Sequence, residues 1–140
     1  MTQQFNRFAL ATVLAVGMSG ISMAGEFRAN CGASEAPADC KRWADILIPQ
    51  YQKAVKGDYA ARRNVAFCYM DGCEVKIRID VVDGCAFRLL ILGTNLRERT
   101  SGDFSNARTD CGKLSPDELR VADGRARDLA RRAGQPWSDR

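Results

Sequence analysis

Apolar side chains recur every three or four residues over most of the chain, a spacing that predicts amphipathic helices. We expect helices over 42–56, 59–70, 81–92 and 104–111, and a last one from Ser115 to a stop at Gly134. Strand-like alternation is confined to "EVKIRID" at 74–80, which is more typical of an extended connection, because no second strand of this kind is available to pair with it. The sequence therefore predicts an all-α fold of antiparallel helix pairs, with the last helix as a C-terminal cap.

Capping and stop signals mark most of these helices. Asp58 and Asp103 are expected to cap the second and fourth helices, and Gly72 is a left-handed terminator for the second. The run Ser115–Glu118, "SPDE", combines an N-cap serine, a proline in the first turn and a capping-box glutamate. Pro49 lies inside the first helix and predicts a break or kink there, or a new start at this residue.

Two helices differ in how much of their surface is apolar. The stretch 81–92 is apolar almost throughout and should pack on most sides, while Arg88 within it should reach solvent or pair with an acidic residue. The last helix should act as a lid packed on one face. We expect its inner face to comprise Leu119, Ala122, Ala126, Leu129, Ala130 and Ala133, and its outer face Arg120, Arg125, Arg127, Arg131 and Arg132.

The first 24 residues are typical of a secretory signal peptide. An apolar run over 8–21 follows Arg7, and small side chains precede a cleavage site after Ala24. The run is shorter than the roughly 20 residues that span a bilayer, so we expect export, to a periplasm or the extracellular space, without stable membrane insertion. The exported bacterial protein would then comprise an arm with a disulfide loop (25–41), a helical domain (42–134) and a short tail (135–140).

Composition narrows the classes of function. The chain without its leader carries 20 basic and 17 acidic residues, and these are interspersed, whereas a nucleic-acid-binding domain usually shows a clustered basic face. The chain contains 0 histidines, which removes the usual general base, the commonest zinc ligand and the histidine-activated nucleophiles. We therefore expect no catalytic residues, no metal and no cofactor.

Six cysteines lie outside the leader, which in a small exported chain is typical of three disulfides. Six cysteines allow 15 connectivities. A zinc site or a thioredoxin-like redox site would favour a C-x-x-C spacing, which the chain lacks. Local geometry favours the pairs Cys31–Cys40 and Cys68–Cys73, which leaves Cys85 to pair with Cys111.

Small residues at regular spacing carry a resemblance to a repeat family. The second helix places Gly57, Ala61, Val65-Ala66, Tyr69 and Gly72 in register, and Asp80, Gly84, Phe87 and Ile91-Leu92 follow. This pattern resembles the Sel-one-like branch of the tetratricopeptide-type helical repeats, although the family usually has a small pair where Ile91-Leu92 stands. The start of a second copy appears at Ala107 and Cys111-Gly112, so the resemblance covers about one and a half units, roughly residues 51–114.

The resemblance implies a short α-solenoid-like array that binds another protein and performs no chemistry. On this hypothesis the binding residues lie on the first helices and in the 93–102 loop, at Gln52, Lys53, Arg97, Glu98 and Arg99. Two alternatives remain open. A small disulfide-bonded domain suits an exported inhibitor or immunity-type protein, because rigidity lowers the entropic cost of binding. A thiol–disulfide oxidoreductase would use Cys68 and Cys73.

Overall fold

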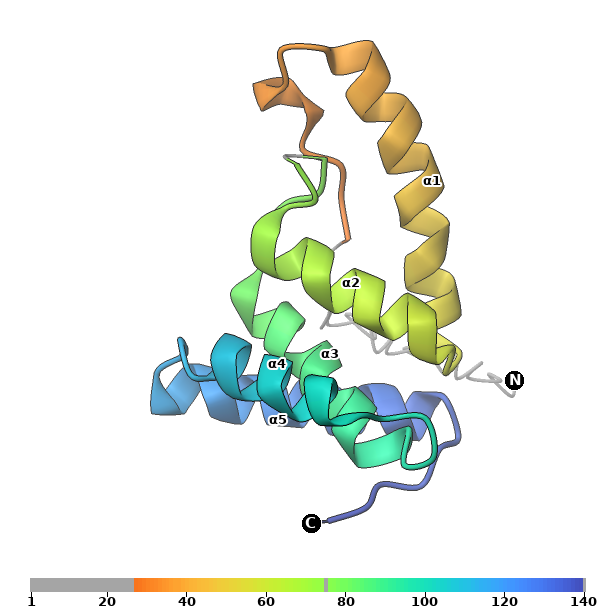
Figure 1. Cartoon of the computed structure of the whole chain (residues 1–140), viewed down its shortest axis with the longest axis vertical. Coiled ribbons are helices and arrows are strands. Elements are labelled where there is room, and N and C mark those ends of the chain that lie inside the picture. Colours follow the sequence, from red (N-terminus) through yellow and green to blue (C-terminus); the bar gives the residue numbers. More distant parts are fainter. Residues whose placement is uncertain (1–26, 75, 140) are drawn as a thin grey trace, which may run out of the picture.

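The computed structural model describes residues 27–74 and 76–139, so the predicted leader and its cleavage site lie outside the described residues. The elements are a short 3-10 helix, η1 (Cys31–Ala33), and five α-helices: α1 (Pro37–Val55), α2 (Tyr59–Asp71), α3 (Val81–Thr94), α4 (Ser101–Cys111) and α5 (Pro116–Arg132) (Figure 1). Within the described residues the only strand-like pairing is an isolated antiparallel bridge between Ala29 and Ile77. The predicted all-α class is confirmed.

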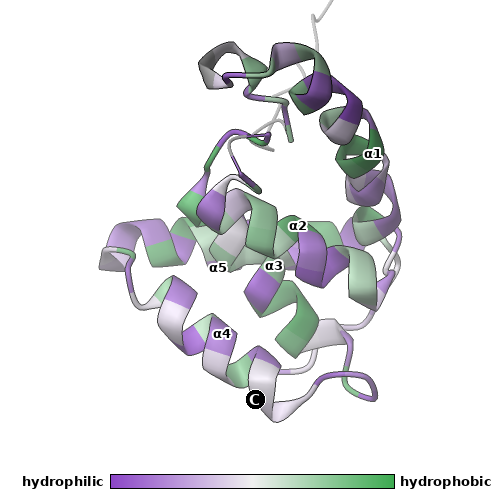
Figure 2. Cartoon of the chain, turned by 45° about the horizontal axis from the view of Figure 1, so that its top comes forward, coloured by the Kyte–Doolittle hydropathy of each residue, from purple (hydrophilic) through white to green (hydrophobic). Residues whose placement is uncertain are grey.

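Helix α3 is the centre of the fold and packs against α2, α4 and α5, as its apolar sequence predicts (Figure 2). Its side chains from Asp83 to Arg88 and from Leu90 to Leu92 are buried. Gly84 allows α2 to approach closely, since a Cβ added there would lie only 2.5 Å from the Sδ atom of Met70. A Cβ at this position would force the Met70 side chain to move, so glycine lets the two helices approach without that rearrangement.

The predicted ends of α2 are confirmed to within one residue. The Asp58 carboxylate accepts a 2.7 Å hydrogen bond from the Ala61 amide, which satisfies one of the free N–H groups of the first turn. Gly72 adopts a left-handed conformation with φ of 80° and donates its N–H to the Cys68 carbonyl at 2.8 Å. This conformation strains any residue with a Cβ, which explains why glycine ends the helix.

The prediction for the first helix was wrong at its start, and of the alternatives at Pro49 neither a break nor a new start occurs. Helix α1 begins at Pro37, within the segment expected to be an arm, because proline is well suited to the first turn. It then runs through Pro49 as a single helix to Val55. Pro49 and Asp45, whose carbonyl loses its helical donor, both lie on the exposed face, so water can satisfy that carbonyl.

The capping role predicted for Asp103 was also wrong. The N-cap of α4 is Thr100, and Asp103 is the third helical residue. Its carboxylate accepts a 2.7 Å hydrogen bond from the Thr100 backbone N–H, the reciprocal contact of a capping box. The helix therefore begins three residues earlier than the sequence suggests.

Helix α5 has the predicted capping box at Ser115 and buries its alanine face against α3, but two positions differ from the prediction. Leu119 is 39% exposed, because residues 115–121 are all uncovered. Arg125 does not lie mainly in water: its Nη1 atom donates at 2.7 Å to Oδ1 of Asp83, a buried carboxylate in the first turn of α3. The start of the last helix is thus more exposed, and its middle more tightly held, than predicted.

The residues before α1 are anchored to the helices. Phe27 is buried in an aromatic cluster, 5.7 Å from the ring of Tyr51 and 5.1 Å from that of Tyr69. Backbone hydrogen bonds of 2.9 Å join Asn30 to Lys76 and Arg78 to Arg28, which places the arm beside the 74–80 connection. The expectation of an extended segment over 74–80 was wrong at its start, because Glu74 adopts a left-handed conformation with φ of 59° and Lys76 lies in a turn before Ile77 forms the bridge.

The buried Arg62 side chain links the ends of two helices to the C-terminal tail. It is 0% exposed, and its Nε atom donates to the Ala54 carbonyl near the end of α1 at 2.9 Å. Nη1 donates to Thr94 and Asn95 at the end of α3 at 2.6 and 2.7 Å, and Nη2 to Gln135 in the tail at 2.5 Å. Burial lowers the pKa of Arg62 to about 10, which leaves the guanidinium charged at neutral pH. Neutral acceptors therefore hold this buried cation.

Three disulfides join Cys31 to Cys40, Cys68 to Cys73 and Cys85 to Cys111, which are the predicted pairs. The first ties η1 to α1, the second closes the end of α2, and the third links α3 to α4. Such oxidation indicates a non-cytoplasmic, oxidising setting. None of the helices in the described part of the chain has both the length and the hydropathy of a membrane span.

A candidate protein-binding groove along α2

One face of α2 presents a row of exposed residues spaced three or four apart. Ala60, Arg63, Asn64, Phe67 and Asp71 are all exposed, while the opposite face of the helix is buried against α1 and α3. Each of these five residues lines one of two surface pockets, and Phe67 lines both. The two pockets share Phe67 as a lining residue, and we name the surface that they make up together the α2 groove.

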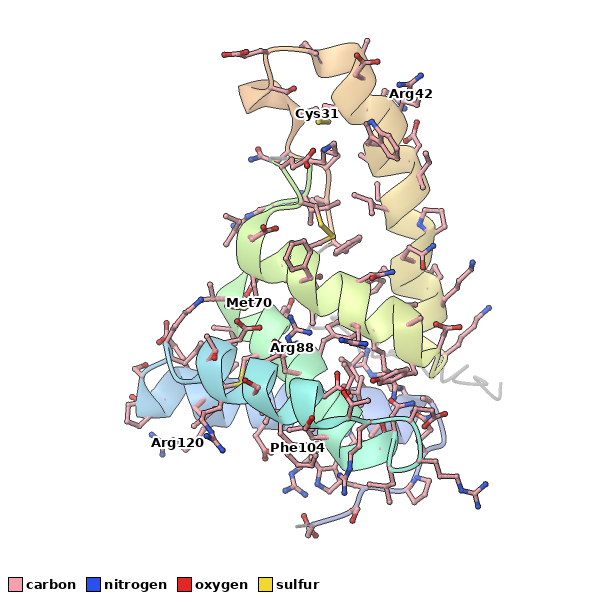
Figure 3. The ribbon with its side chains drawn as sticks, in the orientation of Figure 1. Cys31, Arg42, Met70, Arg88, Phe104 and Arg120 are labelled. Carbon is pink, nitrogen blue, oxygen red and sulfur yellow. A yellow bond between two sulfur atoms is a disulfide. The ribbon has the colours of Figure 1, made fainter. Side chains whose placement is uncertain are left out.

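The first of these, the arginine pocket, has a volume of about 300 Å³ and lies between α2 and α4 with α3 at its base. Figure 3 shows Arg88 reaching from α3 into the space between those two helices. Its lining contains two arginines, two asparagines and no acidic residue. The residues are Tyr59, Ala60, Arg63, Asn64, Phe67, Arg88 and Asn106.

Arg88 is held rigidly at the base of this pocket. Its side chain is only 7% exposed, and Nε donates to Oδ2 of Asp110 at 2.8 Å, so the predicted pairing with an acidic residue is confirmed. Asp110 lies on α4, one residue before the cysteine that bonds to α3. The ion pair and the disulfide therefore fix the guanidinium relative to both helices.

Arg63 forms the upper wall of the arginine pocket. Its guanidinium lies 5.6 Å from the centre of the Tyr59 ring, and its Nε is 3.2 Å from Oδ1 of Asp103. That contact is an ion pair without hydrogen-bond alignment, because the oxygen has no hydrogen-bond partner among the described residues. The other oxygen of Asp103 accepts a 2.6 Å bond from the Tyr59 hydroxyl.

Asp103 is ionised behind this wall. Burial acts to raise the pKa of the carboxyl, but hydrogen bonds from Tyr59 and Thr100, together with the Arg63 cation, outweigh it and lower the pKa below its ordinary value. The same hydrogen bond raises the pKa of the Tyr59 phenol, since the phenolate would repel Asp103. Tyr59 therefore stays neutral and donates its proton to the carboxylate.

The second of the two, the aromatic pocket, has a volume of about 430 Å³ and lies between α1 and the end of α2. Trp43 is 47% exposed and Phe67 is 51% exposed, and both line it. In Figure 2, α1 carries hydrophobic positions along a stretch that stands apart from α3, α4 and α5. The remaining lining residues are Leu47, Asp71, Cys73, Glu74 and Lys76.

The predicted binding residues lie outside the α2 groove. Gln52 and Lys53 are exposed near the end of α1, and Arg97 and Glu98 are exposed after α3. Arg99 is partly buried, donates to the Leu92 carbonyl and lies 5.2 Å from the Phe104 ring. The two segments are brought toward each other by the Arg62 hydrogen bonds to Ala54 and Asn95, but none of the five residues lines either pocket.

The Cys68–Cys73 disulfide borders the aromatic pocket. Cys68 is 1% exposed within the core, whereas Cys73 is partly exposed. A catalytic disulfide needs an accessible attacking thiol, usually near a helix N-terminus, but Cys68 lies in the last turn of α2. Among the described residues no cluster of acidic residues and cysteines could hold a metal ion.

Comparison of the chain with protein-family models, with curated proteins and with solved structures found no match.

Proposed function

We propose that the protein is a non-catalytic, exported module that binds another protein through the α2 groove. The observation that carries the proposal is the pair of half-exposed aromatic side chains, Trp43 on α1 and Phe67 on α2, that line one pocket. Large aromatic residues on a rigid surface are the usual anchors of protein interfaces. The three disulfides support export to a periplasm or the extracellular space.

The architecture is compatible with a degenerate helical repeat of the Sel-one-like type. Ala61, Ala66 and Ala107 are buried, and Gly84 lies against α2, which fits the role of small residues in letting paired helices approach. On this proposal α5 caps the array, and the disulfides supply stability that further repeats would otherwise give. The α2 groove then takes the place of the longer concave surface of a full array.

Photocrosslinking in the periplasm of an expressing bacterium tests the binding function. A benzoylphenylalanine at position 67 should give a discrete protein adduct that mass spectrometry identifies. The same probe at position 121 is the control, because Val121 is 48% exposed but lies on α5. Trp43→Ser should abolish the adduct at position 67. The absence of an adduct, or equal adducts at both positions, would contradict the proposal.

An inhibitor or immunity-type role is a second candidate, favoured by the rigidity beside the groove. The Cys85–Cys111 disulfide and the Arg88–Asp110 ion pair pre-order α3 and α4, so little freedom is lost on binding. If this is the role, the crosslinked partner is an enzyme whose rate falls when the purified protein is added. Deletion of the gene would then be harmful only while a neighbouring toxin gene is present.

A further inference from the structure

We propose that the arginine pocket binds the carboxylate of an aspartate or glutamate side chain in the protein partner. This inference rests on the proposed function, since it assigns a chemical class to what enters one half of the α2 groove. The reasons are the free donors of two arginines, the absence of acidic residues from the lining, and the aromatic wall shared with the neighbouring pocket.

The first reason is the way in which Arg88 is held. Its Nε is used by Asp110, and within the described residues neither Nη nitrogen has a hydrogen-bond acceptor. The side chain is more than nine-tenths buried, yet it lines the pocket, so these N–H groups face the pocket space. A guanidinium presents paired donors that match the two oxygens of a carboxylate.

Arg63 repeats the arrangement at the pocket wall. Its Nε is 3.2 Å from Asp103, and its Nη nitrogens make no hydrogen bond to a described residue. Both carboxylates that balance the arginines are mainly buried, with side chains 1% and 12% exposed for Asp103 and Asp110. The amides of Asn64 and Asn106 add neutral donors to the lining. The pocket therefore presents donors to a ligand while the counter-charges lie behind them.

The aromatic pocket indicates which kind of residue lies next to the acidic residue in the partner. Phe67 lines both pockets, so a segment in the α2 groove that places an acidic side chain at Arg63 and Arg88 extends past Phe67 toward Trp43. The lining there is mainly apolar, its one cation, Lys76, is paired with Glu74 at 2.5 Å, and Asp71 adds a negative charge, so a second acidic group finds no free cation. The motif that fits is one aspartate or glutamate next to a large apolar residue.

Phage display of random peptides on the full protein, purified from the periplasm, tests this assignment without knowledge of the partner. Selected sequences should be enriched in an acidic residue beside a large apolar one. A synthetic peptide with the selected sequence should bind at least about tenfold more tightly than its Glu→Gln or Asp→Asn counterpart, because hydrogen bonds to a charged group are lost. Arg63→Gln should remove that preference, whereas Arg120→Gln, at an exposed residue of α5, should retain it.

Arg88→Lys is the second variant, because it keeps a cation near Asp110 but removes the paired donors, and it should also lose the acidic preference. Peptides that depend on Trp43 but show no acidic preference would overturn the carboxylate assignment and leave the proposed function standing. If no selected peptide loses its binding in the Trp43→Ser variant, the result contradicts both the carboxylate assignment and the proposed function. Stronger displacement of the peptide by inorganic phosphate than by acetate would assign the pocket to phosphate instead, and would also overturn the proposal.

Discussion

Arg88 on α3 and Asp110 on α4 form a buried ion pair of 2.8 Å, with Arg88 three residues after Cys85 and Asp110 one residue before Cys111, its disulfide partner. The covalent bond and the ion pair thus hold the same two helices. Because both charged side chains are largely withdrawn from water, each depends on the other for its stabilisation. The ion pair also determines which Arg88 donors remain for the arginine pocket.

Removal of one partner from this pair should be strongly destabilising. Asp110→Ala leaves the Arg88 cation buried without its carboxylate and should lower the free energy of unfolding by about 3 kcal/mol. The double variant Arg88→Met/Asp110→Leu removes both charges and should recover most of that loss. Urea unfolding of the three proteins measures the difference.

The matched control for the ion pair is Asp117→Ala, which breaks the exposed pair with Arg120. It should change the free energy of unfolding by less than about 1 kcal/mol, because surface pairs are screened by water. An equal effect of Asp110→Ala and Asp117→Ala would mean that the Arg88–Asp110 pair is solvated.

The three disulfides should differ in their contribution to stability according to the loop that each closes. Their cysteines are separated by 26 residues for Cys85–Cys111 and by 5 for Cys68–Cys73. The chain-entropy relation then gives losses of about 3.5 and 2 kcal/mol for the respective double serine variants. Thermal and urea unfolding of the two variants checks the order.

Cys68→Ser alone should lower stability and leave Cys73 as a partly exposed thiol that reacts with iodoacetamide in the native protein. The wild type should show no such reaction, since all six cysteines are paired. Loss of a measurable activity with the fold intact would instead support thiol–disulfide chemistry at this pair.

The sequence predicts α2, α3 and α5 well because the signals that define them are local. Asp58, Gly72 and the Ser115 capping box act within four residues of the helix ends they specify, so the sequence alone identifies them. The early start of α4 was missed because Asp103 can either cap a helix or complete a capping box from its third position. In the fold Thr100 is the N-cap, and Asp103 completes the capping box from the third helical position.

Tertiary contacts account for what the sequence did not predict. Arg62 and Arg63 are identical neighbours, yet Arg62 is fully buried among acceptors 8, 32, 33 and 73 residues away, while Arg63 lines a pocket. The α2 groove was missed for the same reason, because its walls come from four helices that meet only in the folded protein. The binding residues predicted from the repeat resemblance, such as Lys53 and Glu98, line neither pocket.

The fold should lose stability at alkaline pH because buried tyrosines resist ionisation. Burial raises the pKa of Tyr69 above its ordinary value of 10.0, and that of Tyr51 as well. The unfolded chain therefore releases protons more readily, so this stabilisation is complete below pH 10 and is lost as the pH rises through and above that value. Above pH 10, each such tyrosine lowers the free energy of unfolding by at most about 1.4 kcal/mol for each pH unit.

Urea unfolding between pH 9 and pH 12 measures this slope, and absorbance at 295 nm reports tyrosinate. Tyr69→Phe should reduce the slope above pH 10, and the tyrosinate signal of the wild type should rise together with unfolding. An unchanged slope in Tyr69→Phe would mean that this phenol ionises in the native state.

Tyr59 should control the acid end of the stability profile through its hydrogen bond to Asp103. The pKa of Asp103 is lowered in the fold, so its contribution is present above the ordinary value of 3.8 and is lost as the pH falls through the folded pKa. Tyr59→Phe removes the donor of a 2.6 Å hydrogen bond, so it should raise the pKa of Asp103 and lower the free energy of unfolding by about 1 kcal/mol at neutral pH.

Carbon-13 NMR titration of the Asp103 carboxyl measures the shift in its pKa, and Tyr51→Phe is the control for loss of a hydroxyl elsewhere. If the pKa of Asp103 stays the same in Tyr59→Phe, then Thr100 and Arg63 suffice to keep it ionised, and the phenol serves only as a wall of the arginine pocket.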